Sequence, residues 1–256
     1  MGFRWSVLVI VLFNTFFNTL YNLLGIPGAD VKEVSATYSN LFTPAGYAFA
    51  IWGIIYLAFI VYAIYQLLPA RRHSRFFDRM AWPVMLANLL CIIWQVIFRN
   101  YLITGSVAII LATLSTAALM QVMVRRKTNY HTTWLTVPFS LFLGWICVAT
   151  IANISAYLVA INWNGFGIAE STWAMIMIIV ALLTGIILSL SFRDYVVPLV
   201  IAWALIAIYV ARMPENKLTA QTAIVSAVVS LLWATGSFVY QQKRSFSIDI
   251  HHEADA

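Results

Sequence analysis

The side chains of this chain that could do chemistry are uncharged tryptophans and amides placed inside long apolar segments. Five tryptophans lie away from the ends of these segments: Trp52, Trp94, Trp145, Trp203 and Trp233. Indole rings among small residues can line an apolar pocket and still offer N–H donors, a mixture that suits a large flat ligand. Packing between helices explains the same rings equally well, so both interpretations stay open at this point.

Amide side chains form a second group within the apolar segments. Asn14, Asn18 and Asn22 recur every four residues and therefore share one helix face. A buried amide is costly unless it is paired, so this face must contact protein, ligand or water. We favour hydrogen bonds between helices over a stripe that faces a ligand. Asn88 and Gln95 are two helical turns apart and could face the same interior.

Charged chemistry has little support in the sequence. The apolar segments carry Asp, Glu, Lys, Arg and His only at their edges, whereas ion-coupled transporters and proton pumps usually keep an ionisable residue inside the membrane. The sequence offers no residues at metal-ligand spacing, no Ser/His/Asp arrangement and no phosphate loop. We therefore expect no catalytic residues, no metal and no covalent cofactor, and we favour a binding protein over an enzyme.

Composition places the protein in a membrane. Hydrophobic residues make up 62% of the chain, charged residues make up 9%, and the mean hydropathy is +0.88. A soluble domain carries about 25% charged residues, so this chain could not cover its surface in water. The net charge of +6 does not indicate a nucleic-acid partner, because the basic residues lie in short connectors between apolar segments. Cys91 and Cys147 lie within apolar segments and are interpreted as packing residues.

Segment length predicts the fold class. A membrane span needs about 20 apolar residues, and the segments of that kind predict an all-α polytopic membrane bundle of about eight helices: 5–24, 44–68, 80–98, 102–124, 133–161, 171–192, 195–211 and 220–240. Short connectors imply antiparallel neighbours. The longest connector, residues 25–43, could cover a cavity at one end of the bundle.

The basic residues predict the orientation in the membrane. With eight spans, one side holds both termini and the following Lys and Arg residues: Arg4, Arg71, Arg72, Arg75, Arg79, Arg125, Arg126, Lys127, Arg193, Lys243 and Arg244. The other side holds only Lys32, Arg99, Arg212 and Lys217. The positive-inside rule then predicts cytoplasmic termini in a bacterial-type cytoplasmic membrane. The basic connectors 69–79 and 125–131 are interpreted as anchors for lipid headgroups.

Three short patterns resemble the translocator protein family, whose members are also described as tryptophan-rich sensory proteins and peripheral benzodiazepine-receptor homologues. The second helix of that family opens with Pro-Pro-Gly-aromatic-x-Phe and continues to a Trp and a Tyr; the residues here are Pro44, Ala45, Gly46, Tyr47, Phe49, Trp52 and Tyr56. An Asn, a Trp and a Phe of its third helix correspond to Asn88, Trp94 and Phe98, with Cys91 an alternative to Asn88. A Trp, an Ala and an Asn of its fifth helix correspond to Trp145, Ala149 and Asn153.

The resemblance implies a five-helix translocator-like core over residues 1–163. The remaining chain is then divided into a three-helix membrane extension over 168–241 and a disordered cytoplasmic tail over 242–256. Small-residue helix faces could also support a homo-oligomer.

The same resemblance implies a small hydrophobic ligand, a tetrapyrrole such as a porphyrin or haem, held for transport, sensing, reception or scavenging. The residues expected at its pocket are Tyr47, Phe49, Trp52, Asn88, Trp94, Trp145, Ala149 and Asn153. Two alternatives remain: a membrane enzyme that degrades porphyrins, and a small-solute permease that uses the Asn14, Asn18 and Asn22 face.

Overall fold

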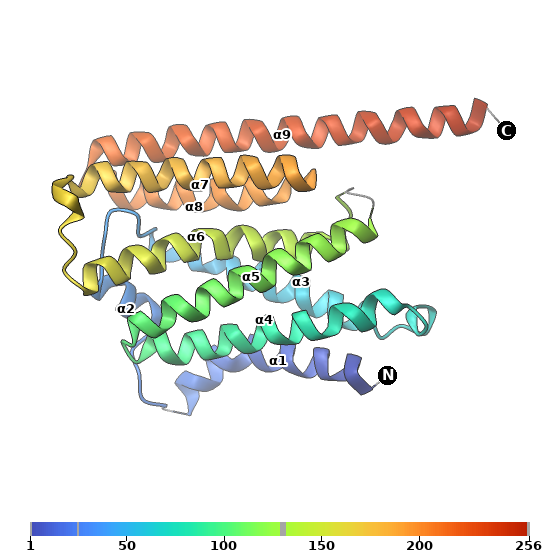
Figure 1. Cartoon of the computed structure of the whole chain (residues 1–256), viewed down its shortest axis with the longest axis horizontal. Coiled ribbons are helices and arrows are strands. Elements are labelled where there is room, and N and C mark those ends of the chain that lie inside the picture. Colours follow the sequence, from blue (N-terminus) through green and yellow to red (C-terminus); the bar gives the residue numbers. More distant parts are fainter. Residues whose placement is uncertain (1, 25, 129–131, 255–256) are drawn as a thin grey trace.

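The computed structural model describes residues 2–24, 26–128 and 132–254, and their regular secondary structure is helical (Figure 1). The side chains of residues 2, 18, 19, 22 and 244–254 lie outside that description. No strand occurs in these ranges, so the predicted all-α class is confirmed. The elements in chain order are α1 (Gly2–Leu23), α2 (Val31–Thr37), the 3-10 helix η1 (Gly46–Ala50), α3 (Ile51–Tyr65), the 3-10 helix η2 (Pro69–Arg71), α4 (Arg75–Arg99), α5 (Ile103–Lys127), α6 (Val137–Ala160), the 3-10 helix η3 (Gly165–Gly167), α7 (Glu170–Phe192), α8 (Val196–Arg212) and α9 (Lys217–Ala254).

The long helices run side by side along one axis and form a polytopic membrane bundle (Figure 1). Six stretches in the described residues are long and apolar enough to cross a bilayer: Gly46–Tyr65, Arg75–Arg99, Ile103–Lys127, Val137–Ala160, Glu170–Phe192 and Lys217–Lys243. Phe3–Phe17 and Val196–Arg212 are shorter apolar helices. Both chain ends lie toward the end of the bundle opposite α2, as an even number of passes requires (Figure 1). Which end faces the cytoplasm stays a prediction.

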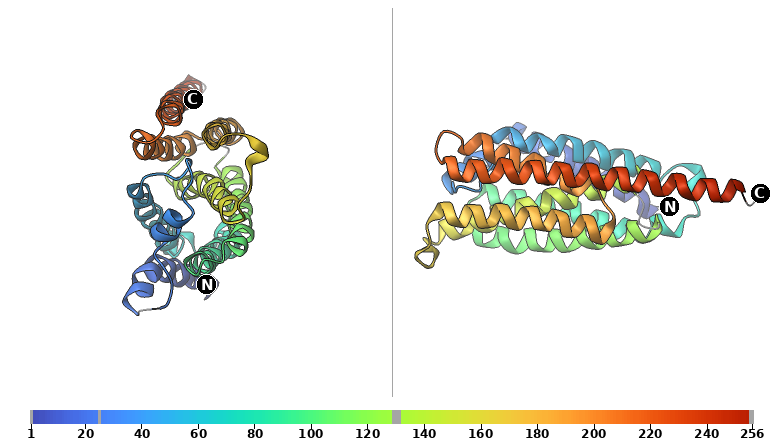
Figure 2. Two further views of the ribbon diagram at one scale, coloured as in Figure 1. Left: turned by 90° about the vertical axis from the view of Figure 1, so that its left-hand side faces the viewer. Right: turned by 90° about the horizontal axis from the view of Figure 1, so that it is seen from above.

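The five long helices α1, α3, α4, α5 and α6 pack in a closed sequence, in which α1 contacts α4 and α3, α5 lies between α4 and α6, and α6 contacts α3 (Figure 2). Helix α8 packs on the outside of α6, and α9 packs against α8 and α7. One hydrophobic cluster includes Trp145 of α6, Val200 of α8 and Ala223 of α9. The core is therefore continuous across the predicted division near residue 165, and that division stays a prediction.

Two helix ends differ from their predicted positions. The segment that follows Pro44 begins as the 3-10 turn η1 at Gly46, and the regular helix starts only at Ile51. At the other end of the chain, α9 continues as a helix to Ala254, where the sequence predicted a disordered tail from residue 242. The tail contains no Gly or Pro that would interrupt a helix begun upstream, which accounts for the difference.

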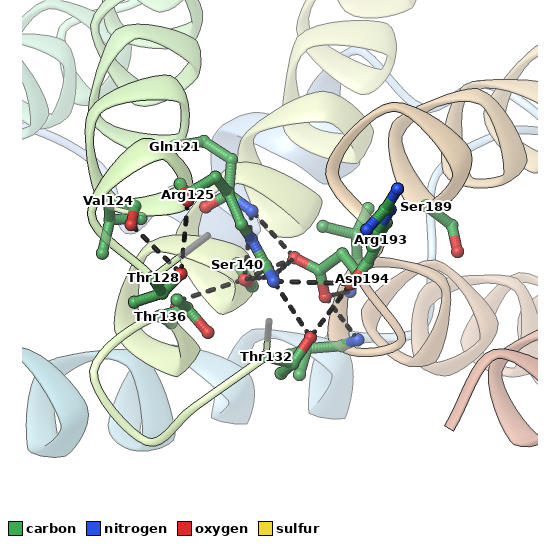
Figure 3. A network of polar contacts seen from close by, with 12 residues as sticks. Gln121, Val124, Arg125, Thr128, Thr132, Thr136, Ser140, Ser189, Arg193 and Asp194 are labelled. Carbon is green, nitrogen blue, oxygen red and sulfur yellow. Dashed lines mark hydrogen bonds and ion pairs between the residues drawn. The ribbon is translucent and has the colours of Figure 1, made fainter. Parts of the chain in front are cut away.

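A buried ion pair joins α5 to the connector between α7 and α8 (Figure 3). Arg125 and Asp194 are both fully buried, and the Nη2 of Arg125 donates to the Asp194 carboxylate. The same carboxylate accepts hydrogen bonds from Ser140 Oγ at 2.5 Å and from Gln121 Nε2 at 2.8 Å. Its second oxygen accepts from the backbone N–H of Val196 at 2.7 Å, at the start of α8. The network thus ties α5, α6 and α8 together.

The basic residues Arg4 and Arg125 are buried, and for Arg125 this corrects the interpretation as a lipid anchor. Arg125, expected among the lipid anchors of the 125–131 connector, lies inside the protein. Arg4 is 2% exposed, and it donates to the carbonyl oxygens of Arg71 and Ser74 at 2.8 Å each and to Asp78 at 2.7 Å. An arginine can satisfy several acceptors with its five N–H donors, so each side chain holds several chain segments together.

Removing one partner of the Arg125–Asp194 pair should strongly destabilise the protein. The Arg125→Met substitution leaves the Asp194 carboxylate buried without its counter-charge, and such a change costs about 3–5 kcal/mol. The loss should appear as a lower unfolding midpoint in detergent. The matched control is Arg126→Met, because Arg126 is exposed on the next position of α5. Equal midpoints for the two variants would show that the pair does not hold the fold.

Candidate functional site

A cavity of about 250 Å³ lies among η1, α3, α4, α5 and α6. The α2 segment adds Asp30 and Lys32 to its lining, and because these two residues are exposed they mark its mouth. Helices α3 and α4 contribute Trp52 and Trp94 to its wall, and α5 contributes Ile110 and Thr113. Helix α6 contributes a row of residues at helical spacing: Trp145, Ala149, Ala152, Asn153 and Ala156. The small alanines of this row leave the space that the aromatic rings border. The cavity is therefore formed by helices of the predicted five-helix core.

The aromatic rings of the wall are held by contacts with one another. Trp52 stacks on Tyr56 with a centroid distance of 5.3 Å, and Trp94 stacks on Phe98 at 4.6 Å. Phe49 of η1 meets Trp145 of α6 edge to face at 6.0 Å. Such pairs contribute about 0.5–1.5 kcal/mol beyond the area they bury. The wall is consequently a set of braced rings with fixed orientations.

One hydrogen-bonded chain connects three helices beside the cavity. Trp94 Nε1 of α4 donates to Asn153 Oδ1 of α6 at 2.6 Å, and Asn153 Nδ2 donates to Ser106 Oγ of α5 at 2.9 Å. Two groups expected to contact a ligand therefore bond to each other. They fix the spacing of the three helices around the cavity.

Six of the eight residues expected at the pocket line this cavity: Phe49, Trp52, Trp94, Trp145, Ala149 and Asn153. Tyr47 lies elsewhere, 43% exposed, with its ring 5.4 Å from that of Trp203. Asn88 accepts a hydrogen bond from Asn14 at 2.9 Å and donates to the carbonyl of Val84 at 2.9 Å. The pairing of Asn14 with Asn88 is a contact between helices; the side chains of Asn18 and Asn22 lie outside the described residues.

Several residues of the cavity were not among those expected at the pocket. Gln95, which the sequence placed on an interior face with Asn88, lies on the cavity wall, four residues beyond Cys91 on the same face of α4. Asp30 and Lys32 at the mouth come from the α2 segment. The 25–43 connector therefore reaches the cavity, but nothing in its sequence indicates which of its residues do so.

The C-terminal end of α4 holds the segment that precedes α2. Arg99 Nε donates to the carbonyl of Ala29 at 2.9 Å, and the guanidinium lies 3.9 Å from the centroid of the Tyr21 ring. Tyr21 Oη donates to the carbonyl of Pro27 at 2.5 Å. Gly28 has a φ of +140°, and a Cβ there would lie 2.6 Å from Tyr21 Oη. Glycine is thus required for the close approach of this segment to α1 and α4.

The aromatic segment 46–50 is held from the outside by α8. Ala45 N–H donates to the carbonyl of Ala207 at 3.1 Å, and Trp203 Nε1 donates to the carbonyl of Ala48 at 3.1 Å. Because η1 supplies Phe49 to the cavity, these bonds let α8 position part of the wall without touching the interior.

The cavity is lined mostly by apolar and neutral polar side chains. No group of three or more His, Cys, Asp or Glu side chains placed to hold a metal ion occurs in the described ranges. The charged side chains of the lining, Asp30 and Lys32, both belong to the α2 segment at the mouth. The interior offers aromatic surface and neutral polar atoms, which suits non-covalent binding.

A protein-family model described as TSPO-like protein matches residues 4–236 of the chain. The match begins in α1 and ends in α9, so it runs through the predicted five-helix core and the predicted extension. No match is found among curated proteins or among solved structures.

Replacing Asn153 should destabilise the protein by disconnecting three helices. The Asn153→Leu substitution leaves Trp94 Nε1 without its acceptor, and a buried polar group without a partner costs about 1–3 kcal/mol. A lower thermal midpoint should therefore accompany a change in tryptophan emission. Ser155→Ala is the control on the same helix, because Ser155 bonds only to its own helix backbone, at Ile151. A midpoint for Asn153→Leu no lower than that of Ser155→Ala would contradict this role.

Proposed function

Because the chain belongs to the family of TSPO-like proteins and is an integral membrane protein, we propose that it binds a flat hydrophobic ligand of the tetrapyrrole class in its cavity. The observation that carries the proposal is the wall itself, where rings from η1, α3, α4 and α6 surround one space: Phe49, Trp52, Tyr56, Trp94, Phe98 and Trp145. Aromatic faces and a few neutral polar atoms are the usual lining of a site for a large flat molecule.

The size of the cavity adds a condition to this proposal. Ligand sites usually measure about 300–1,000 Å³, and the cavity measures about 250 Å³. A macrocycle therefore requires the space to widen. The segment best suited to move is α2, which packs through a small cluster of Val34, Phe98 and Ile103 that is separate from the main core. Segments with few buried apolar contacts open at low free-energy cost.

The proposed mechanism is enclosure without covalent chemistry. The ligand would enter at the α2 end, lie against the indole rings and leave by the same route, in the service of transport, sensing or scavenging. The rings of Trp52 and Trp145 present N–H groups that donate to no residue in the described part of the chain, so they are available to a ligand.

Porphyrin binding should depend on the two tryptophans of the wall. In purified protein, the combined Trp52→Phe and Trp145→Phe variant should bind protoporphyrin about tenfold more weakly, because two indole contacts of about 0.5–1.5 kcal/mol each are reduced. Quenching of protein fluorescence during titration measures the affinity. The matched control is Trp233→Phe, since Trp233 Nε1 donates to Ser189 on the distant α7–α9 face. An unchanged affinity in the double variant, or an equal loss in the control, would place the binding site elsewhere.

A further inference from the structure

Gln95 is a buried amide whose hydrogen-bonding capacity the protein does not use. Its side chain is 8% exposed, it lines the cavity, and it makes no hydrogen bond to any other residue of the described ranges. A primary amide can donate two hydrogen bonds and accept two. Its amide nitrogen and oxygen are not among the fully enclosed polar atoms that lack a partner in the described residues, so they face the cavity space. A molecule that enters the cavity can therefore reach them.

The other amides of the bundle interior contrast with Gln95. Asn153 is bonded to Trp94 and Ser106, and Asn88 is bonded to Asn14 and to its own helix. Gln121 donates to the Asp194 carboxylate. These amides hold helices together. Gln95 has no such role among the described contacts, and it faces the one space in which a ligand is proposed.

Within the cavity lining, the neutral amide of Gln95 and the charged side chains lie on different elements. Gln95 lies in α4 between Cys91 and Phe98, which are both buried cavity residues. The charged residues of the lining, Asp30 and Lys32, belong to the α2 segment at the mouth. A charged group beside Gln95 would lose its hydration without gaining a counter-charge, which is strongly unfavourable. An uncharged polar atom is therefore the partner that Gln95 can accommodate.

We propose that Gln95 is the specificity-determining residue of the cavity and selects flat aromatic ligands that carry an uncharged ring nitrogen or oxygen. This inference rests on the proposed function, because it concerns the ligand of the same cavity. The Gln95 amide donates to the ring heteroatom, or accepts from a ring N–H, while the indoles hold the flat faces. A site built to hydrogen-bond a ligand discriminates against an analogue that lacks the polar atom, because the amide then stays unpaired.

A matched pair of probes tests this selection. Acridine and anthracene have the same shape and differ by one ring nitrogen, and both can be titrated by fluorescence at a pH where acridine is uncharged. The preference for acridine, taken as the ratio of the two affinities, should fall about fivefold in Gln95→Met, because one hydrogen bond of roughly 1 kcal/mol is lost. The control is Leu89→Met, at a 46% exposed position of the same helix, and its ratio should equal that of the wild type.

A second readout separates ligand recognition from packing. Because Gln95 makes no hydrogen bond to another residue of the described ranges, Gln95→Met removes none, and the thermal midpoint of the ligand-free protein should not fall. Gln95→Leu serves as the second variant and should behave in the same way. A fall in the midpoint together with an unchanged probe ratio would assign Gln95 to packing and overturn the inference, as would a wild type that does not prefer acridine.

Protoporphyrin titration of the same preparations keeps the two proposals distinct. Porphyrin binding that depends on Trp52 and Trp145, without any effect of Gln95→Met on the probe ratio, would overturn the inference and leave the proposed function intact. Absence of both porphyrin and probe binding would overturn both.

Discussion

The buried ion pair of Arg125 and Asp194 is the constraint on which the rest of the bundle depends. Taking two charges out of water is expensive, and the cost is met only when the pair is close and its remaining donors and acceptors are satisfied. Here Ser140, Gln121 and the first backbone N–H of α8 donate further hydrogen bonds to the Asp194 carboxylate. The fold can satisfy these groups only with α5, α6 and α8 in one arrangement, so the pair specifies how α8 and its neighbours dock on the preceding helices.

Much of this fold could be predicted from the sequence, because hydropathy alone sets helix number and length in a membrane. In the described residues, six of the eight predicted spans correspond to helices long enough to cross a bilayer, and the first and seventh correspond to the shorter apolar helices Phe3–Phe17 and Val196–Arg212. Which side chains of distant helices would contact each other could not be predicted. Arg125 looks like an interfacial anchor, because it is followed by two further basic residues at a helix end, and its partner Asp194 lies in a connector far along the chain. Such a pair becomes visible only when α5 and α8 are placed in space.

In the candidate site too, positions that follow from helical spacing could be predicted, and positions that depend on contacts between helices could not. Trp145, Ala149 and Asn153 recur at helical spacing, so one helix face carries them all to the cavity. Tyr47 departs from expectation because η1 is a 3-10 turn, which rotates successive side chains differently from an α-helix and sends this ring to Trp203. Asn88 departs because its partner Asn14 belongs to α1. The sequence could show that these side chains need partners, but the partners were determined by packing.

The hydrogen bonds from Ala45 to Ala207 and from Trp203 to Ala48 have a thermodynamic consequence. They place the inner wall of the cavity and the outer helix α8 in a single linked equilibrium. Any molecule that binds more tightly when η1 is docked must stabilise the docking of α8 by the same free energy, and an event that loosens α8 must weaken that binding equally. A change in the docking of α8 therefore changes the affinity of the cavity for a ligand. Binding in the cavity is in turn felt by a lipid or protein that contacts the far side of these helices, although the ligand itself never reaches that side.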